Sequence, residues 1–289
     1  MGKADGVRAS CLLVRCISAL RGSGIAGAEK EAEIILTAAI GIDRVSLYRD
    51  DPVISEEEMK KAQEIIGRRR RREPLQYIMG CADFFGLRFE VGPGVLVPRP
   101  ETELLAEEVI RRALAIDEKG AVSILDLCTG SGCIALAAAK RLPHAAISGT
   151  DISGDALDYA HRNKEHHKAD NVTFLRGGLF EPVGGMRFDI IVSNPPYVRS
   201  KDIDGLEPEV KDWEPRGALD GDEDGLKYHR EILKAAPSYL KEKGVVMLEI
   251  ADGQAASVGL LSSSAGFRDA ALIRDYAGLE RVMVFEWNF

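Results

Sequence analysis

Apolar residues recur at roughly helical spacing from the N-terminus to about residue 75. The recurring positions are Val7, Leu12, Leu13, Ile17 and Leu20, followed by Ala32, Ile34, Ile35, Leu36 and Ala39. A further helix is predicted to begin after Ser55, because Ser55 and Glu58 match the pattern of a capping box. We therefore predict an N-terminal helical-bundle domain over residues 1–74.

That last helix ends in five consecutive arginines, Arg68 to Arg72, and Pro74 stops it. Such a run can contact RNA or an acidic partner. We favour the alternative of a solvated helix end, in which positive charge is stabilised by the helix dipole.

Short β-like pieces at residues 77–79, 84–85 and 87–91 follow, separated by glycine and proline. This pattern predicts a β-hairpin linker over residues 75–97, between the helical domain and the rest of the chain.

From residue 98 the pattern alternates between strands and helices, which is typical of a doubly wound, mostly parallel sheet. The predicted strands are residues 122–127, 145–150, 172–175, 189–193, 245–250, 268–274 and 280–286, and the predicted helices are residues 133–141, 154–165, 227–240 and 254–265. The last two strands are close in sequence, so we expect them to form an antiparallel hairpin at the sheet edge. The fold class is α/β, with a seven-stranded Rossmann-like domain over residues 98–289.

A distinctive tetrapeptide, Asn194-Pro195-Pro196-Tyr197, follows directly on the predicted strand 189–193. Ligands of open α/β sheets bind at the carboxyl ends of such strands. The prolines fix the backbone, so the Asn194 side-chain oxygen and the Pro195 carbonyl become two fixed acceptors beside an aromatic ring. Together they form a receptor for a planar NH2 group, as a methyltransferase acting on an amide or an exocyclic amine requires. The alternative is a loop that merely ends the strand.

A glycine turn follows the first strand of this domain, over Cys128-Thr129-Gly130-Ser131-Gly132. The pyrophosphate fingerprint G-x-G-x-x-G is incomplete because Ala135 replaces its third glycine, which favours a cofactor without a pyrophosphate. Asp151 ends the next strand, where a carboxylate can accept both hydroxyls of a ribose. A helix N-cap is the alternative for Asp151, and the glycine turn beside it favours ribose binding.

Composition excludes several classes of protein. The chain has 289 residues and a formal net charge of −8, so it is not a general electrostatic clamp for nucleic acid. Its five cysteines form no CxxC pair and have no histidine at metal-ligand spacing, so we expect reduced thiols and no metal. No apolar run approaches the length of a membrane span. The default expectation is a cytoplasmic protein.

Several of these elements occur together in the order and spacing of one family. Besides the glycine turn, Asp151 and the Asn-Pro-Pro-Tyr tetrapeptide, they include Pro98-Arg99-Pro100-Glu101-Thr102-Glu103 and Glu214-Pro215-Arg216-Gly217-Ala218-Leu219-Asp220-Gly221. The chain strongly resembles the HemK/PrmC family of protein-(glutamine-N5) methyltransferases, which modify class I peptide chain release factors. The resemblance covers nearly everything from Glu73 onward, whereas the N-terminal helices fit by architecture.

The resemblance implies S-adenosyl-L-methionine as methyl donor and S-adenosyl-L-homocysteine as product. The implied cofactor-binding residues are Cys128, Thr129, Gly130, Ser131, Gly132, Asp151, Leu179 and Asn194. The implied substrate-binding residues are Asn194, Pro195, Pro196 and Tyr197, of which Asn194, Pro195 and Tyr197 are the predicted catalytic residues. The N-terminal domain is implied to dock the protein substrate.

Two positions depart from the family pattern. Members often have glycine where Cys128 stands, which suggests a backbone position that tolerates a Cβ. They usually have an acidic residue where Gly178 stands, and its loss would weaken cofactor binding by about 1 kcal/mol.

We therefore predict methylation of the glutamine amide in the Gly-Gly-Gln motif of class I release factors, without stable nucleic-acid or membrane binding. A nucleic-acid amine methyltransferase, acting on adenine N6 or guanine N2, is the main alternative. A non-catalytic scaffold that binds through Arg68 to Arg72 is another. Acidic residues at Glu101 and Glu103 either cap a helix or order the cofactor entrance, and Glu249, at a strand end, is interpreted as structural.

Overall fold

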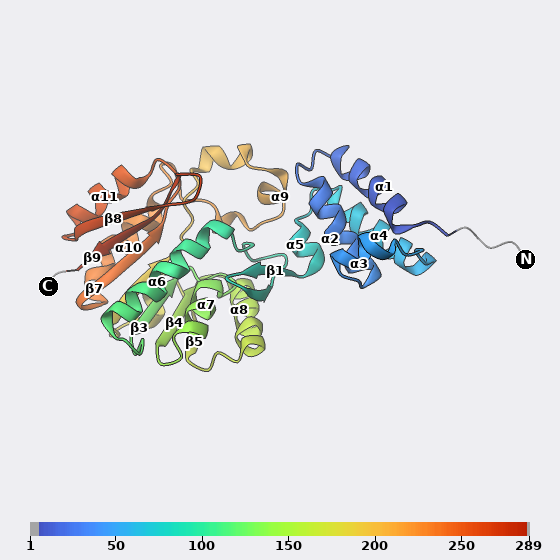
Figure 1. Cartoon of the computed structure of the whole chain (residues 1–289). Coiled ribbons are helices and arrows are strands. Elements are labelled where there is room, and N and C mark those ends of the chain that lie inside the picture. The colour runs from blue at the N-terminus through green and yellow to red at the C-terminus, as the bar shows by residue number, and fades with distance from the viewer. Residues whose placement is uncertain (1–5, 288–289) are drawn as a thin grey trace, which may run out of the picture. The chain divides into compact units, whose positions relative to one another are not determined.

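The computed structural model describes residues 6–287 and, within strand β8, omits the side chains of residues 269 and 270 (Figure 1). The first five and last two residues of the predicted domains lie outside it. The chain forms two compact units. One contains the chain up to Met79 together with Pro208–Trp213, and the other contains Gly80–Glu207 and the chain from Glu214 onward. The sequence-based boundaries at residues 74 and 97 stay predictions.

The first unit is helical, as the periodicity predicts. Its helices are α1 (Ala9–Arg21), α2 (Ala28–Ile40), α3 (Arg44–Asp50), α4 (Glu56–Arg69), α5 (Leu75–Met79) and α9 (Pro208–Lys211). Ser55 and Glu58 form the predicted capping box at the start of α4. Leu20, Ile35 and Leu36 are fully buried in the core of this unit.

One local prediction in this unit is wrong, and one helix was not predicted. Residues 77–79 form part of helix α5 and not a β-like piece, because Pro74 starts a helical turn by accepting the Tyr77 and Ile78 amides. Helix α3 was not predicted, although Asp43 caps it by accepting a hydrogen bond from the Ser46 amide.

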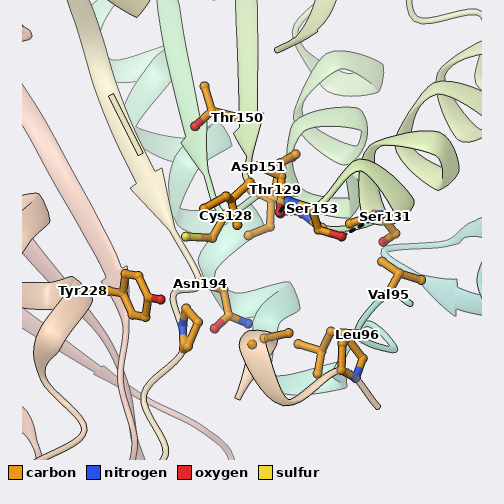
Figure 2. Close-up of a pocket in the computed structure, with 18 of the residues that line it drawn as sticks. Val95, Leu96, Cys128, Thr129, Ser131, Thr150, Asp151, Ser153, Asn194 and Tyr228 are labelled. Atoms are coloured by element: carbon orange, nitrogen blue, oxygen red, sulfur yellow. Dashed lines mark hydrogen bonds between the residues drawn. The ribbon is translucent and has the colours of Figure 1, made fainter. Parts of the chain in front are cut away.

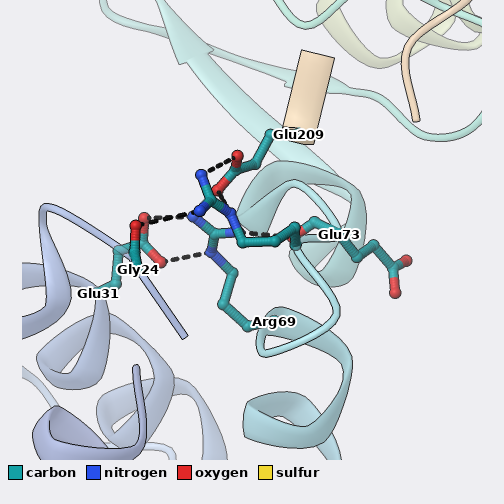
Figure 3. Close-up of polar contacts among 6 residues, drawn as sticks. Gly24, Glu31, Arg69, Glu73 and Glu209 are labelled. Carbon is teal, nitrogen blue, oxygen red and sulfur yellow. Dashed lines mark hydrogen bonds and ion pairs between the residues drawn. The ribbon is translucent and has the colours of Figure 1, made fainter. Parts of the chain in front are cut away.

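The arginine run is not simply a solvated helix end. Arg69 is buried and pairs with Glu31 (2.6 Å) and Glu209 (2.6 Å), as Figure 3 shows. Arg72 holds the same Glu209 carboxylate through Nε (2.7 Å) and Nη2 (2.5 Å). Arg68 pairs with Glu73.

Only Arg70 and Arg71 of the run are exposed. The other three arginines therefore hold this unit together, including the segment 208–213 that returns to it from far along the chain.

The second unit contains the predicted seven-stranded sheet. Its strands are β3 (Ser123–Leu127), β4 (Ala146–Asp151), β5 (Val172–Arg176), β6 (Phe188–Ser193), β7 (Leu240–Glu249), β8 (Arg268–Arg274) and β9 (Glu280–Glu286). They lie in the order β5-β4-β3-β6-β7-β9-β8. Strands β3 to β7 pair in parallel, whereas β9 is antiparallel to both β7 and β8. The predicted antiparallel edge is confirmed.

Helices cover both faces of this sheet (Figure 1). They are α6 (Glu103–Ile116), α7 (Cys133–Arg141), α8 (Gly154–His167), α10 (Lys227–Ala235) and α11 (Ala255–Ser264). Leu125 and Leu127 of β3 pack into one core with α10 and α11. A two-stranded hairpin, β1 (Cys81–Phe84) with β2 (Leu87–Glu90), belongs to this unit as well.

The predicted helix 227–240 is too long. Helix α10 ends at Ala235, a short 3-10 turn covers Ala236–Ser238, and β7 begins at Leu240. Pro237 has no amide hydrogen to donate, so the α-helical hydrogen-bond pattern cannot continue through it.

Candidate active site

The carboxyl ends of three neighbouring strands bring the predicted site residues together. Leu127 of β3 is paired with Ser193 of β6 on one side and with Thr150 of β4 on the other. The glycine turn, Asn194 and Asp151 therefore start from adjacent positions on one sheet edge. The strand order reverses direction between β3 and β6, the kind of crevice where open α/β sheets bind ligands.

A cavity of about 600 Å³ opens at this edge (Figure 2). Its apolar walls include Val95, Leu96, Ile134, Ile152 and Leu179, and its polar lining includes Thr129, Ser131, Asp151, Asn194 and Tyr228. A cavity of this volume, mostly apolar with a few convergent polar groups, is typical of a small-molecule site.

Asp151 is fixed from two sides. Its Oδ2 accepts from the Gly130 amide (2.9 Å), and its Oδ1 accepts from the Ser153 amide (2.9 Å). Burial raises its pKa, and these backbone hydrogen bonds act in the opposite direction. A carboxylate has about four lone-pair sites, so both oxygens can still accept hydroxyl groups from a ligand. Asp151 also provides no N-cap to α8, because Ser153 caps that helix.

The glycine turn approaches the cavity closely. Gly132 is not among the lining residues. Its φ is +80°, and a Cβ there would lie 2.7 Å from Phe174, so the turn requires glycine at this position. Cys128 has φ of +57°, in the left-handed region that favours glycine. The position accommodates the Cβ of Cys128 at a cost of roughly 1 kcal/mol.

Polar groups are available for a ligand with a ribose and a polar tail. Ser131 lines the cavity, and its Oγ is buried without a hydrogen-bond partner among the described residues. Thr150 donates to the Leu179 carbonyl (2.8 Å), which fixes the adjacent wall. Gly178 also lines the cavity, and its amide donates to Glu181 (3.2 Å). These residues fit an S-adenosylmethionine-like cofactor.

Only two residues of the Asn-Pro-Pro-Tyr tetrapeptide line the cavity. They are Asn194 and Pro196. Tyr197 directs its hydroxyl to Glu249 Oε1 (3.1 Å) instead, and Asn194 Nδ2 donates to Thr102 Oγ1 (3.1 Å).

Two buried carboxylates lie at this sheet edge. Burial raises the pKa of Glu249 to about 7, against the lowering effect of hydrogen bonds from Thr102 and Tyr197. Burial likewise raises the pKa of Asp126 to about 7, against its hydrogen bond from Thr129. Neither carboxylate is among the residues that line the cavity, and strongly raised pKa values close to a crevice are a mark of functional sites.

The segment after α9 closes another side of the cavity. Pro215, Gly217 and Ala218 line it, and the buried Glu214 anchors them. Glu214 accepts from Arg99 Nη2 (2.6 Å) and from the Val97 amide (3.2 Å).

Comparison with known proteins agrees with this architecture. The model of the PrmC N-terminal domain matches residues 12–80, and the model of the methyltransferase small domain matches residues 102–206. A release factor glutamine methyltransferase of Geobacter sulfurreducens is 47% identical over 261 residues, which cover 90% of this chain and 90% of that protein. Another, from Thermodesulfovibrio yellowstonii, is 44% identical over 257 residues, which cover 89% of this chain and 92% of that protein.

The chain belongs to the release factor glutamine methyltransferase family. Solved structures agree on the fold. A methyltransferase of Pyrococcus furiosus aligns with a TM-score of 0.55 at 22% identity, over 77% of this chain and 99% of that one. A T. thermophilus 16S rRNA N2 G1207 methyltransferase, in complex with AdoMet and guanosine, aligns with a TM-score of 0.52 at 20% identity over 71% of this chain and 49% of that one.

With the family established, the predicted site residues can be placed. Cys128, Thr129, Gly130, Ser131, Asp151, Leu179, Asn194 and Pro196 all line the cavity. The cavity lining does not include Gly132, Pro195 or Tyr197. The roles given to these residues stay predictions.

Sequence reasoning did not single out Thr102 as a site residue and took Glu249 for a structural one. A buried acid at the end of a core strand is the signal that could have drawn attention to Glu249.

Among the described residues, no group of three His, Cys, Asp or Glu side chains could hold a metal ion. The helices within residues 6–287 include none with the length and hydrophobicity of a membrane span.

Proposed function

We propose that this protein transfers a methyl group from S-adenosyl-L-methionine to the side-chain amide nitrogen (N5) of the glutamine in the Gly-Gly-Gln motif of class I release factors. The observation that carries the proposal is the position of Asn194. It lines the same cavity as Asp151 and the glycine turn, so a methyl donor and an NH2 group can meet there.

The cofactor supplies an electrophilic methyl group on a sulfonium sulfur when bound. We assign its ribose to Asp151 and its polar tail to the turn that contains Gly130 and Ser131. Leu179 and Ile152 supply apolar surface for its base.

The acceptor amide is a weak nucleophile because its lone pair is delocalised into the carbonyl. The Asn194 side-chain oxygen and the Pro195 carbonyl accept from its NH2 group and align the nitrogen with the methyl carbon. Positive charge grows on that nitrogen as the new bond forms, so both acceptors bind the transition state more strongly than the substrate. The proton then lost from the nitrogen needs no dedicated base.

We assign docking of the release factor to the helical unit, which the PrmC N-terminal model matches. A substrate that works in translation termination places the reaction in the cytoplasm.

The proposal is tested by incubating the protein with labelled S-adenosylmethionine and an unmodified release factor, with DNA and RNA in parallel reactions. Mapping the label by mass spectrometry should find one methyl group on the Gly-Gly-Gln glutamine. Label on nucleic acid alone would replace the proposal with the amine methyltransferase alternative, and absence of label from every acceptor would contradict both.

The role of Asn194 has its own test. Asn194→Ala should lower the rate of methyl transfer by roughly a hundredfold to a thousandfold, as removal of one transition-state contact does elsewhere. Lys201→Ala, an exposed change in the 3-10 helix Ser200–Gly205 that follows, is the control and should leave the rate unchanged. An Asn194→Ala enzyme of normal activity would refute the mechanism.

A further inference from the structure

The orientation of the Asn194 side chain is the starting point. An asparagine amide has nearly the same shape when its oxygen and nitrogen are exchanged, so only hydrogen bonds decide which of them faces a ligand. In this structure Nδ2 donates to Thr102 Oγ1 (3.1 Å). Oδ1 has no hydrogen-bond donor among the described residues, and the residue lines the cavity.

The Thr102 hydroxyl can enforce that orientation only if its own hydrogen is engaged elsewhere. A hydroxyl has a single hydrogen to donate, and a free one could turn to Asn194 Oδ1 instead. Thr102 is one of the groups that lower the pKa of Glu249, so we assign its hydrogen to the Glu249 carboxylate. Thr102 and Glu249 are each 2% exposed, so bulk water does not compete for this hydrogen.

Glu249 holds the tetrapeptide at a second point. Its Oε1 accepts from the Tyr197 hydroxyl (3.1 Å), while its Oε2 is buried without a hydrogen-bond partner among the described residues. An ionised carboxylate only accepts hydrogen bonds. The Tyr197 hydroxyl is therefore a donor to Glu249. With the Thr102 hydrogen assigned to the same carboxylate, Thr102 is left to accept from Asn194.

We propose that Thr102 and Glu249 are positioning residues that keep the Asn194 oxygen turned towards the acceptor nitrogen. This inference rests on the proposed function and assigns it two residues from distant parts of the chain. Thr102 lies in the short 3-10 helix Pro100–Thr102, and Glu249 ends β7. A reversed Asn194 would present NH2 to the NH2 of the substrate, which removes an acceptor and opposes the positive charge that develops there.

A pair of substitutions at Thr102 tests the inference. Thr102→Val has almost the same shape but cannot accept from Asn194, whereas Thr102→Ser keeps the hydroxyl. We expect Thr102→Val to lower kcat by about tenfold to a hundredfold, and Thr102→Ser to stay within about threefold of the unchanged protein. Both should bind S-adenosylmethionine with the same Kd within about threefold, because the change affects orientation of the acceptor.

The outcomes are distinct. Loss of kcat in Thr102→Val with rescue in Thr102→Ser, at equal thermal stability, supports the inference. Equal kcat in Thr102→Val and the unchanged protein overturns it, and so does equal loss in both variants. If the unchanged protein does not methylate a release factor, the proposed function has failed instead.

The dependence of kcat on pH is a second readout, which a purely structural role of Glu249 would leave unchanged. The groups around the Glu249 side chain are Thr102 and Glu101 on the 3-10 helix, Tyr197 after β6 and Arg281 on β9, with His229 of α10 on its backbone oxygen. Protonated Glu249 can donate to Thr102 and so release the threonine hydrogen to Asn194. At saturating cofactor, kcat should therefore fall on the acid side in the unchanged protein and lose this dependence in Glu249→Gln. Identical profiles would overturn the part assigned to Glu249.

Discussion

In the helical unit, buried and half-buried carboxylates face guanidinium groups. At the sheet edge, Asp126 and Glu249 instead accept hydrogen bonds from hydroxyl groups. Glu209 sits between Arg69 and Arg72, and these interactions lower its pKa against the effect of burial. Glu249 accepts from Tyr197, and burial raises its pKa to about 7.

The difference separates two uses of a buried charge. A carboxylate paired with arginine is compensated and can hold distant segments together. A carboxylate buried beside neutral donors lowers the stability of the fold at neutral pH. Retention of such a carboxylate close to a ligand cavity is expected where it orders catalytic groups.

The largest expected effect is in the helical unit. Arg69→Met should lower the free energy of unfolding by about 4 kcal/mol, because it leaves the carboxylates of Glu31 and Glu209 without their shared partner. Chemical denaturation measures this loss. Arg70→Met, the exposed neighbour, is the control and should change stability by less than about 0.5 kcal/mol. Equal effects of the two changes would mean that the ion pairs do not hold this unit.

Glu249→Gln should raise the free energy of unfolding, in contrast to Arg69→Met. The pKa of Glu249 is about 7 in the folded protein, above its ordinary 4.5, so the folded form binds its proton more tightly. The stability associated with protonated Glu249 is fully present below about pH 4.5 and is lost as pH rises to about 7. The variant cannot ionise, so it should be more stable than the unchanged protein by roughly 3 kcal/mol at about pH 8 and nearly equal to it at about pH 5.

Unfolding curves at the two pH values measure this difference. Glu242→Gln, at an exposed position of the same strand, should show no such pH dependence. A Glu249→Gln protein that is less stable at the higher pH would contradict the assignment.

Arg72→Lys should have a smaller effect. Arginine binds Glu209 through two nitrogens, and lysine can offer only a point charge. We expect a loss of about 1 kcal/mol in the free energy of unfolding. Arg71→Lys is the matched exposed control. A loss as large as that of Arg69→Met would show that the fork geometry matters more than burial.

The smallest effect is expected at Cys128. Glycine adopts its φ of +57° without strain, so Cys128→Gly should stabilise the fold by less than about 1 kcal/mol, partly offset by the greater freedom of glycine in the unfolded chain. Thermal unfolding without ligand measures this change. Marked destabilisation would show that the Cys128 side chain contributes packing that outweighs its strain.

Local patterns account for what the sequence could predict. Apolar runs followed by turn residues predict the strands that end at Leu127 and Ser193. Parallel pairing then brings the ends of these strands together. The capping box of α4 is likewise contained in four consecutive residues.

The remaining features depend on long-range side-chain pairing. Glu209 lies 137 positions after Arg72, and no periodicity links them, so the arginine run looked like a solvated helix end. Thr102 and Glu249 gain their roles only when the 3-10 helix contacts Asn194 and β7 contacts Tyr197. Nothing local distinguishes such a threonine from one that begins a helix.

The central claim is that the carboxylate of Glu249 lowers stability and serves methyl transfer. The most direct test measures the free energy of unfolding and the single-turnover rate of release-factor methylation on one preparation of Glu249→Gln at about pH 8. The account predicts that the variant is more stable and slower than the unchanged protein. A variant that is less stable, or that is more stable but equally fast, would contradict it.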